Sequence, residues 1–78
     1  MTPKNHTPLS KVKKGNIVRI ITLPDGLART QLIRFGIVEG DLVKCLEHLP
    51  GGTIVIQKKR QEIALGSKLS HKIIVIIN

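Results

Sequence analysis

The sequence has 78 residues and a formal net charge of +8, because 13 Lys and Arg residues stand against five Asp and Glu residues. A chain of this length makes one small domain, and its 41% of hydrophobic residues is enough for one core and too much for a disordered chain. Its single aromatic residue argues against a stacking platform for bases and against an aromatic groove for proline-rich peptides.

The first third of the chain predicts a tail, a turn and a strand. Residues 1–8 contain two prolines and no periodicity, so we expect a loose tail ahead of a single domain at residues 9–78. The apolar spacing within residues 9–15 suits one helical turn that ends at a glycine. The β-branched run at residues 16–22 predicts the first strand, and the turn residues at 24–26 end it.

One helix is predicted, at residues 27–35. Ala28, Leu32 and Phe35 recur at i, i+4 and i+7 and form one apolar stripe. Leu32 and Phe35 are therefore predicted to be buried in the core. Gly36 follows at once and suits the left-handed position after a helix end. Because so short a helix has little stability of its own, we expect it to pack on a sheet.

The second half of the chain predicts four more short strands, at residues 41–49, 53–57, 62–65 and 72–77, with a single turn at 66–70 before the last of them. The last strand is apolar on both faces, which is typical of a strand that is central or that closes a barrel. Five short strands with one helix inserted after the first predict a mainly β fold, in which a small, strongly bent sheet closes into a barrel.

A set of short motifs runs through the chain. They are Leu9-x-x-Val12-x-x-Gly15, Leu32 followed by Phe35-Gly36-Ile37, then Gly40, Pro50-Gly51-Gly52, Ile63-Ala64-Leu65 and Ile73-x-Val75. In their order and spacing these motifs resemble the ferrous iron transport protein A (FeoA) family, and the likeness covers nearly the whole chain. Gly15, Gly36 and Gly40 are predicted to permit positive φ angles or tight turns in the backbone.

The resemblance implies an SH3-like five-stranded barrel with one helix after the first strand. It also implies a non-enzymatic cytoplasmic accessory of bacterial ferrous iron uptake, whose partner is FeoB, a membrane permease with a cytoplasmic GTP-binding region. Contact with the inner membrane surface and self-association into a homo-oligomer are left open. A related domain ends some metal-dependent repressors, but we expect no DNA-binding domain in so short a chain, which favours the stand-alone accessory.

Two groups of residues are candidates for partner binding. The helix and its exit loop offer apolar side chains with basic neighbours, namely Leu27, Arg29, Ile33, Arg34 and Ile37. The basic run Lys58, Lys59 and Arg60 offers attraction to an acidic protein surface, to membrane headgroups or to nucleic acid. A small basic barrel that binds nucleic acid is the alternative function, although the sequence lacks aromatic platforms and a recognition helix.

Few residues suit catalysis or metal binding. The serines lie in no nucleophile motif and the acids are scattered, so we predict no enzyme and no required cofactor. Cys45, His48 and His71 are weak candidates for a divalent metal, and a metal-sensing module is a third possible function. Cys45 and His48 need a bulge to converge, because strand alternation places them on opposite faces. Cys45 suits a buried apolar position better, and a lone cysteine favours a cytoplasmic protein.

Overall fold

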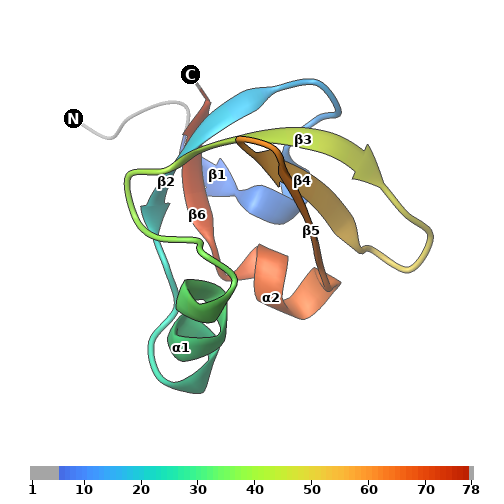
Figure 1. The fold of residues 1–78 in the computed structure, drawn as a ribbon. Helices are drawn as coiled ribbons and strands as arrows, with labels where there is room; N and C mark the ends of the chain where they lie inside the picture. The colour runs from blue at the N-terminus through green and yellow to red at the C-terminus, as the bar shows by residue number, and fades with distance from the viewer. Residues whose placement is uncertain (1–5, 78) are drawn as a thin grey trace.

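One antiparallel sheet of six strands forms the body of the molecule (Figure 1). The computed structural model describes residues 6–77. The strands are β1 (His6–Pro8), β2 (Ile17–Thr22), β3 (Leu42–His48), β4 (Ile54–Lys58), β5 (Gln61–Leu65) and β6 (Ile74–Ile77). A 3-10 turn, η1 (Leu9–Lys11), and two α-helices, α1 (Leu27–Arg34) and α2 (Ser67–His71), complete the elements. The strand order across the sheet is β1-β6-β2-β3-β4-β5.

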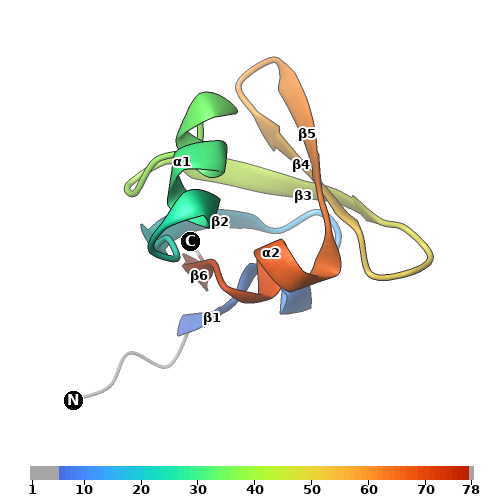
Figure 2. The ribbon, with the colours of Figure 1, turned by 90° about the horizontal axis from the view of Figure 1, so that it is seen from below.

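The predicted mainly β, SH3-like fold with a helix after the first predicted strand is confirmed, but the sheet is open. Strands β1 and β5 are its two edges and do not pair with each other. Helix α2 and η1 lie between these edges, where they cover the end of the curved sheet (Figure 2). The predicted closure into a five-stranded barrel is therefore corrected to an open six-stranded sheet, whose gap is filled by helical segments.

The sixth strand comes from the segment predicted as a loose tail. Residues His6–Pro8 pair with residues 74–76 of β6. Strand β6 consequently lies between β1 and β2, which is the central position that its two apolar faces predicted. Pro8 is tolerated because β1 is an edge strand, where a missing N–H leaves no neighbour unpaired. Residues 1–5 of the predicted tail lie outside the described residues.

The hydrophobic core collects the inward side chains of strands β2 to β6 together with residues of the loops and of α1. Its buried members are Leu9, Val12, Val18, Ile20, Leu23, Leu32, Ile37, Val43, Cys45, Ile54, Ile56, Ile63, Leu65, Ile73 and Val75. Leu69 packs against this core from α2, which forms where the sequence predicted only a single turn. The buried hydroxyl of Ser70 donates to the carbonyl oxygen of Ser67 at 3.2 Å, so α2 buries no unpaired polar side-chain atom.

The C-terminal end of α1 corrects two predictions about burial. Leu32 is buried as predicted, but Phe35 is 49% exposed and Ile37, predicted to face a partner, is fully buried. Gly36 has a φ of 86°, and the N–H groups of Gly36 and Ile37 donate to the carbonyl oxygens of Ile33 and Leu32, both at 2.9 Å. This pair of bonds defines a Schellman motif, in which the residue after the left-handed glycine packs back on the helix. Ile37 therefore takes the core position predicted for Phe35.

Candidate functional site

Large apolar side chains remain exposed on α1 and its exit loop. We call this region, formed by Leu27, Ile33, Phe35 and Val38, the α1 surface; the side chains of Leu27 and Ile33 are 73% and 48% exposed. Helix α1 lies below the sheet in the view of Figure 1 and is joined to the sheet by loops at both ends (Figures 1 and 2). Only Leu32 of the helix itself is buried, so most of its circumference faces solvent.

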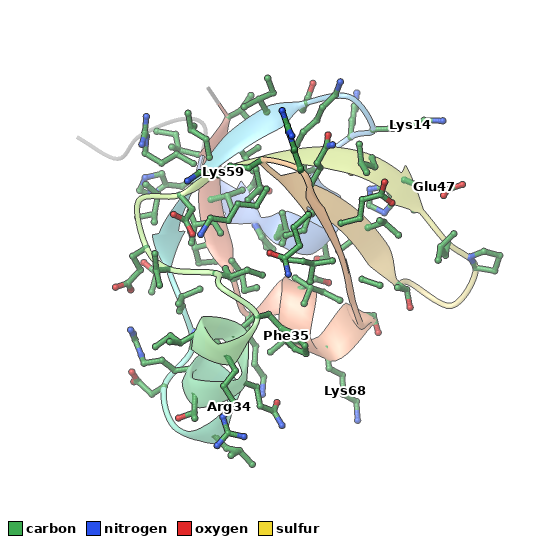
Figure 3. All side chains as sticks on the ribbon, viewed as in Figure 1. Lys14, Arg34, Phe35, Glu47, Lys59 and Lys68 are labelled. Atoms are coloured by element: carbon green, nitrogen blue, oxygen red, sulfur yellow. The ribbon has the colours of Figure 1, made fainter. Side chains whose placement is uncertain are left out.

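The two arginines of α1 have different surroundings. Arg29 donates to the carbonyl oxygen of Leu23 at 3.3 Å and pairs with Glu39 at 3.5 Å and Asp25 at 3.7 Å. Glu39 also accepts from the N–H of Leu23, and this bond and the bond from Arg29 lower the pKa of its carboxyl. Arg29 thus ties the two loops that flank α1. Arg34 forms no ion pair within residues 6–77 and its side chain points away from the sheet (Figure 3).

The three residues of the predicted basic run, Lys58, Lys59 and Arg60, also differ in their surroundings. Lys58 pairs with Asp41 at 2.9 Å and donates to the carbonyl oxygen of Gly36, so it fastens the β4–β5 hairpin to the exit loop of α1. Lys59 and Arg60 are exposed at the turn of that hairpin. The structure therefore brings the basic hairpin beside the α1 exit loop, and it leaves Lys59 and Arg60 as the cations of the run that face solvent.

Asp41 makes the contact between the hairpin and the loop sensitive to pH. Burial raises the pKa of its carboxyl, but the hydrogen bonds from Lys58 and from the N–H of Val38, with the charges of Lys58 and Lys59, outweigh burial and hold the pKa below its ordinary value of 3.8. A carboxyl whose pKa is depressed in the folded state stabilises the fold above its unfolded pKa. That contribution is lost as the pH falls through the folded pKa.

We therefore expect Asp41→Asn to lower the Tm at about pH 6, and we expect the gap between the variant and the parent to close as the pH falls below about 4. Differential scanning calorimetry at several pH values measures this gap. Glu62→Gln serves as the control, because Glu62 is an exposed carboxylate on β5 that pairs with no cation in residues 6–77. A gap that stays constant down to about pH 2 would contradict the assigned role of the carboxylate.

A bulge in β3 brings Cys45 and His48 to one backbone atom. The pairing of β3 with β4 shifts register between Cys45 and Glu47. After this shift the Cys45 Sγ lies 3.7 Å and the His48 Nε2 lies 2.5 Å from the carbonyl oxygen of Val12. Cys45 is buried as predicted, and burial raises the pKa of its thiol. The bulge that Cys45 and His48 needed in order to converge is therefore present. The two side chains converge on a backbone carbonyl oxygen of the loop before β2.

His48 and His71, which are distant in sequence, line one pocket of about 470 Å³. Ser10 of η1, Gly52 of the β3–β4 turn and Ser67, Lys68 and Lys72 of the α2 segment complete its wall. We call this the η1–α2 pocket. The His71 Nδ1 lies 3.3 Å from the Ser10 Oγ, which links α2 to η1. Within residues 6–77 no three His, Cys, Asp or Glu side chains are grouped closely enough to hold a metal ion.

The η1–α2 pocket was missed from the sequence. Its walls come from three segments that are far apart in the chain and that meet only once the sheet has curled. One signal was available, since Lys68 and Lys72 are four residues apart and share a face of a helical segment. That signal depended on recognising residues 67–71 as a helix.

Among the helices that the structure describes, none is long and apolar enough to span a membrane.

Comparison with known proteins places this architecture in a family. The model of the FeoA domain matches residues 7–77. A crystal structure described as an iron uptake regulatory protein (FeoA) is 26% identical, with a TM-score of 0.84 over 94% of this chain and 97% of that one. The FeoA protein from Chlorobium tepidum is 25% identical, with a TM-score of 0.81 over 91% of this chain and 70% of that one.

A manganese-dependent transcriptional repressor has the same fold in part of its length. It is 17% identical, with a TM-score of 0.88 over 100% of this chain and 45% of the repressor. At that identity the likeness concerns the fold alone. A comparison with curated protein sequences finds no match. Because the family model spans nearly all of the described residues, the chain belongs to the FeoA domain family.

Proposed function

We propose that this chain is a non-enzymatic accessory of bacterial ferrous iron uptake, which acts in the cytoplasm by docking onto the GTP-binding region of a FeoB permease. The observation that carries the docking is the α1 surface, where large apolar side chains stay exposed on a small domain. Membership in the FeoA family, and the likeness to a protein described as an iron uptake regulatory protein, support the pathway. Iron is the cargo of the permease in this proposal, and no resident metal is assigned to this chain.

The α1 surface combines exposed apolar side chains with basic neighbours, a combination that is found at protein interfaces. Leu27 and Arg34 are seven residues apart, so they share one face of the helix over two turns. Exposed apolar side chains have an unfavourable free energy in water, which a partner relieves by covering them. Lys59 and Arg60 stand near the exit loop and add attraction at longer range to an acidic partner.

Two substitutions separate the apolar and the charged contributions. Ile33→Asp is expected to speed dissociation from the cytoplasmic region of the permease by roughly tenfold or more, because it removes a central apolar contact. Arg34→Glu is expected to slow association by roughly three- to tenfold at low salt and by less at high salt, because a rim charge acts mainly on encounter. Surface plasmon resonance at two salt concentrations measures both rates.

Matched controls come from the start of β2 and from the loop before it. Ile17 is 47% exposed, nearly the same as Ile33, so Ile17→Asp introduces an equal charge at an equally exposed apolar position on β2. Lys13→Glu reverses one charge in the loop before β2, as Arg34→Glu does on α1. Both controls are expected to bind with nearly parental kinetics. If the controls and the α1 variants change the rates alike, with the fold intact by circular dichroism, the docking surface is not α1.

Nucleic-acid binding is the competing function, because the net charge of +8 attracts any polyanion. The same chip can carry a duplex of random sequence at physiological salt. We expect the permease region to bind more tightly than the duplex. Tighter binding to the duplex, reduced equally by Arg34→Glu and Lys13→Glu, would favour the nucleic-acid alternative and count against docking.

A further inference from the structure

The η1–α2 pocket is separate from the α1 surface. Its lining residues come from η1, from the α2 segment, and from the end of β3 and the turn that joins β3 to β4, and none of them belongs to α1. Figure 2 shows α1 and α2 as separate helices. Its volume of about 470 Å³ is within the range of pockets that hold small ligands. No role in docking through α1 uses this pocket, so its chemistry requires its own explanation.

The polar groups around the η1–α2 pocket are mostly donors. Lys68, Lys72, Ser10 and Ser67 are among the residues that line it, and the ammonium and hydroxyl groups of these side chains are hydrogen-bond donors. None of the described residues that line it is acidic. The His48 Nε2 donates to the carbonyl oxygen of Val12, because a carbonyl can only accept, and this bond fixes the ring in the wall. A pocket with several donors and no carboxylate attracts an anion and disfavours a metal cation.

We propose that the η1–α2 pocket binds a phosphate group. A phosphate presents oxygens in several directions, which suits separate point donors such as two ammonium groups and two hydroxyls. A planar carboxylate is best held by the paired N–H groups of an arginine, and no arginine lines this pocket. The phosphate can belong to a free small anion or to a lipid headgroup, since the recognising chemistry is the same for both.

The lysines have the reach that such a site needs. The Lys68 side chain extends from α2 into solvent (Figure 3), and a flexible four-carbon stem lets its ammonium close over an anion at the pocket mouth. Ser10 and His71 are already linked across the pocket at 3.3 Å, so one wall is held in place before any ligand arrives. We therefore expect binding to order the two lysine side chains.

The test uses the full chain and two double variants of equal charge. Lys68→Ala with Lys72→Ala removes two cations from the pocket. Lys13→Ala with Lys14→Ala removes two exposed cations from the loop before β2, and Lys14 lies at the opposite end of the molecule from Lys68 (Figure 3). The probes are inorganic phosphate, followed by amide chemical shifts at constant ionic strength, and vesicles of phosphatidylglycerol or phosphatidylcholine, followed by sedimentation.

We expect a saturable response to phosphate at residues 9–11 and 66–72, weakened by roughly tenfold or more in the pocket variant and by less than about twofold in the control variant. Such a response without preferential vesicle binding identifies a free anion. Loss of phosphatidylglycerol binding in the pocket variant alone identifies a lipid headgroup. Equal effects of the two variants on both probes, or no response to either probe, would overturn the proposal. The α1 variants are not used, so docking through α1 stands or falls separately.

Discussion

Replacing Leu32 by alanine is expected to lower the free energy of unfolding by about 2–5 kcal/mol, a large share of the stability of a domain of this size. Leu32 is fully buried and belongs to the core cluster. Its carbonyl oxygen also accepts the bond from Ile37 that closes the end of α1. The truncation therefore leaves a cavity at the point where the helix is fastened to the sheet.

Phe35→Ala provides the contrast for this prediction, because Phe35 is 49% exposed and truncating it opens no closed cavity. We expect it to cost clearly less than Leu32→Ala, at about 1 kcal/mol. Chemical denaturation followed by circular dichroism measures both values. A Leu32→Ala variant that melts within about one degree of the parent would refute the packing described for α1.

Gly52→Ala is expected to be the most damaging glycine substitution in the β3–β4 turn. Gly52 has a φ of 91°, a conformation that L-residues adopt only with strain, and a Cβ atom there would lie 2.7 Å from the Cβ of Ser67. That neighbour is the first side-chain atom of α2, so relief requires the backbone of α2 or of the turn to move. We expect a loss of about 2–4 kcal/mol, combining backbone strain and the steric contact.

Gly51→Ala isolates the strain from the contact. Gly51 has a φ of 90°, but a Cβ atom there would meet nothing within 4 Å. We expect this control to lose about 1–2 kcal/mol, from backbone strain alone. The difference between the two variants in urea denaturation measures how tightly the turn packs on α2. Equal losses would mean that α2 shifts freely and that this wall of the η1–α2 pocket is soft.

Much of the fold was predictable because strand patterns and turn residues are local signals. The ends of strands β2 to β6 lie within two residues of their predicted positions. Strand β1 was not predictable in this way, since His6–Pro8 is too short and too polar to show alternation. It forms because β6 is apolar on both faces and has a free edge until β1 covers it.

The candidate sites were less predictable, because they depend on how segments meet. Periodicity placed Phe35 in the helical stripe, yet the glycine that ends α1 reverses the chain and gives the inward position to Ile37. Counting charges placed Lys58 with Lys59 and Arg60, but only the folded hairpin brings Lys58 to Asp41. The sequence indicated His48 and His71 only as weak candidates for a metal. Their shared pocket forms only when η1, β3 and α2 come together.

The attachment of α1 to the sheet leaves most positions of the helix free to vary in sequence. Of the eight residues of α1, only Leu32 is buried, and the fastening of the helix relies on Ile37 just beyond it and on Arg29 at the flanking loops. Most outward positions are therefore free of packing constraints. In the docking role that we propose for α1, substitutions there would change which partner is recognised while the sheet keeps its stability, so partner choice and folding could evolve almost independently.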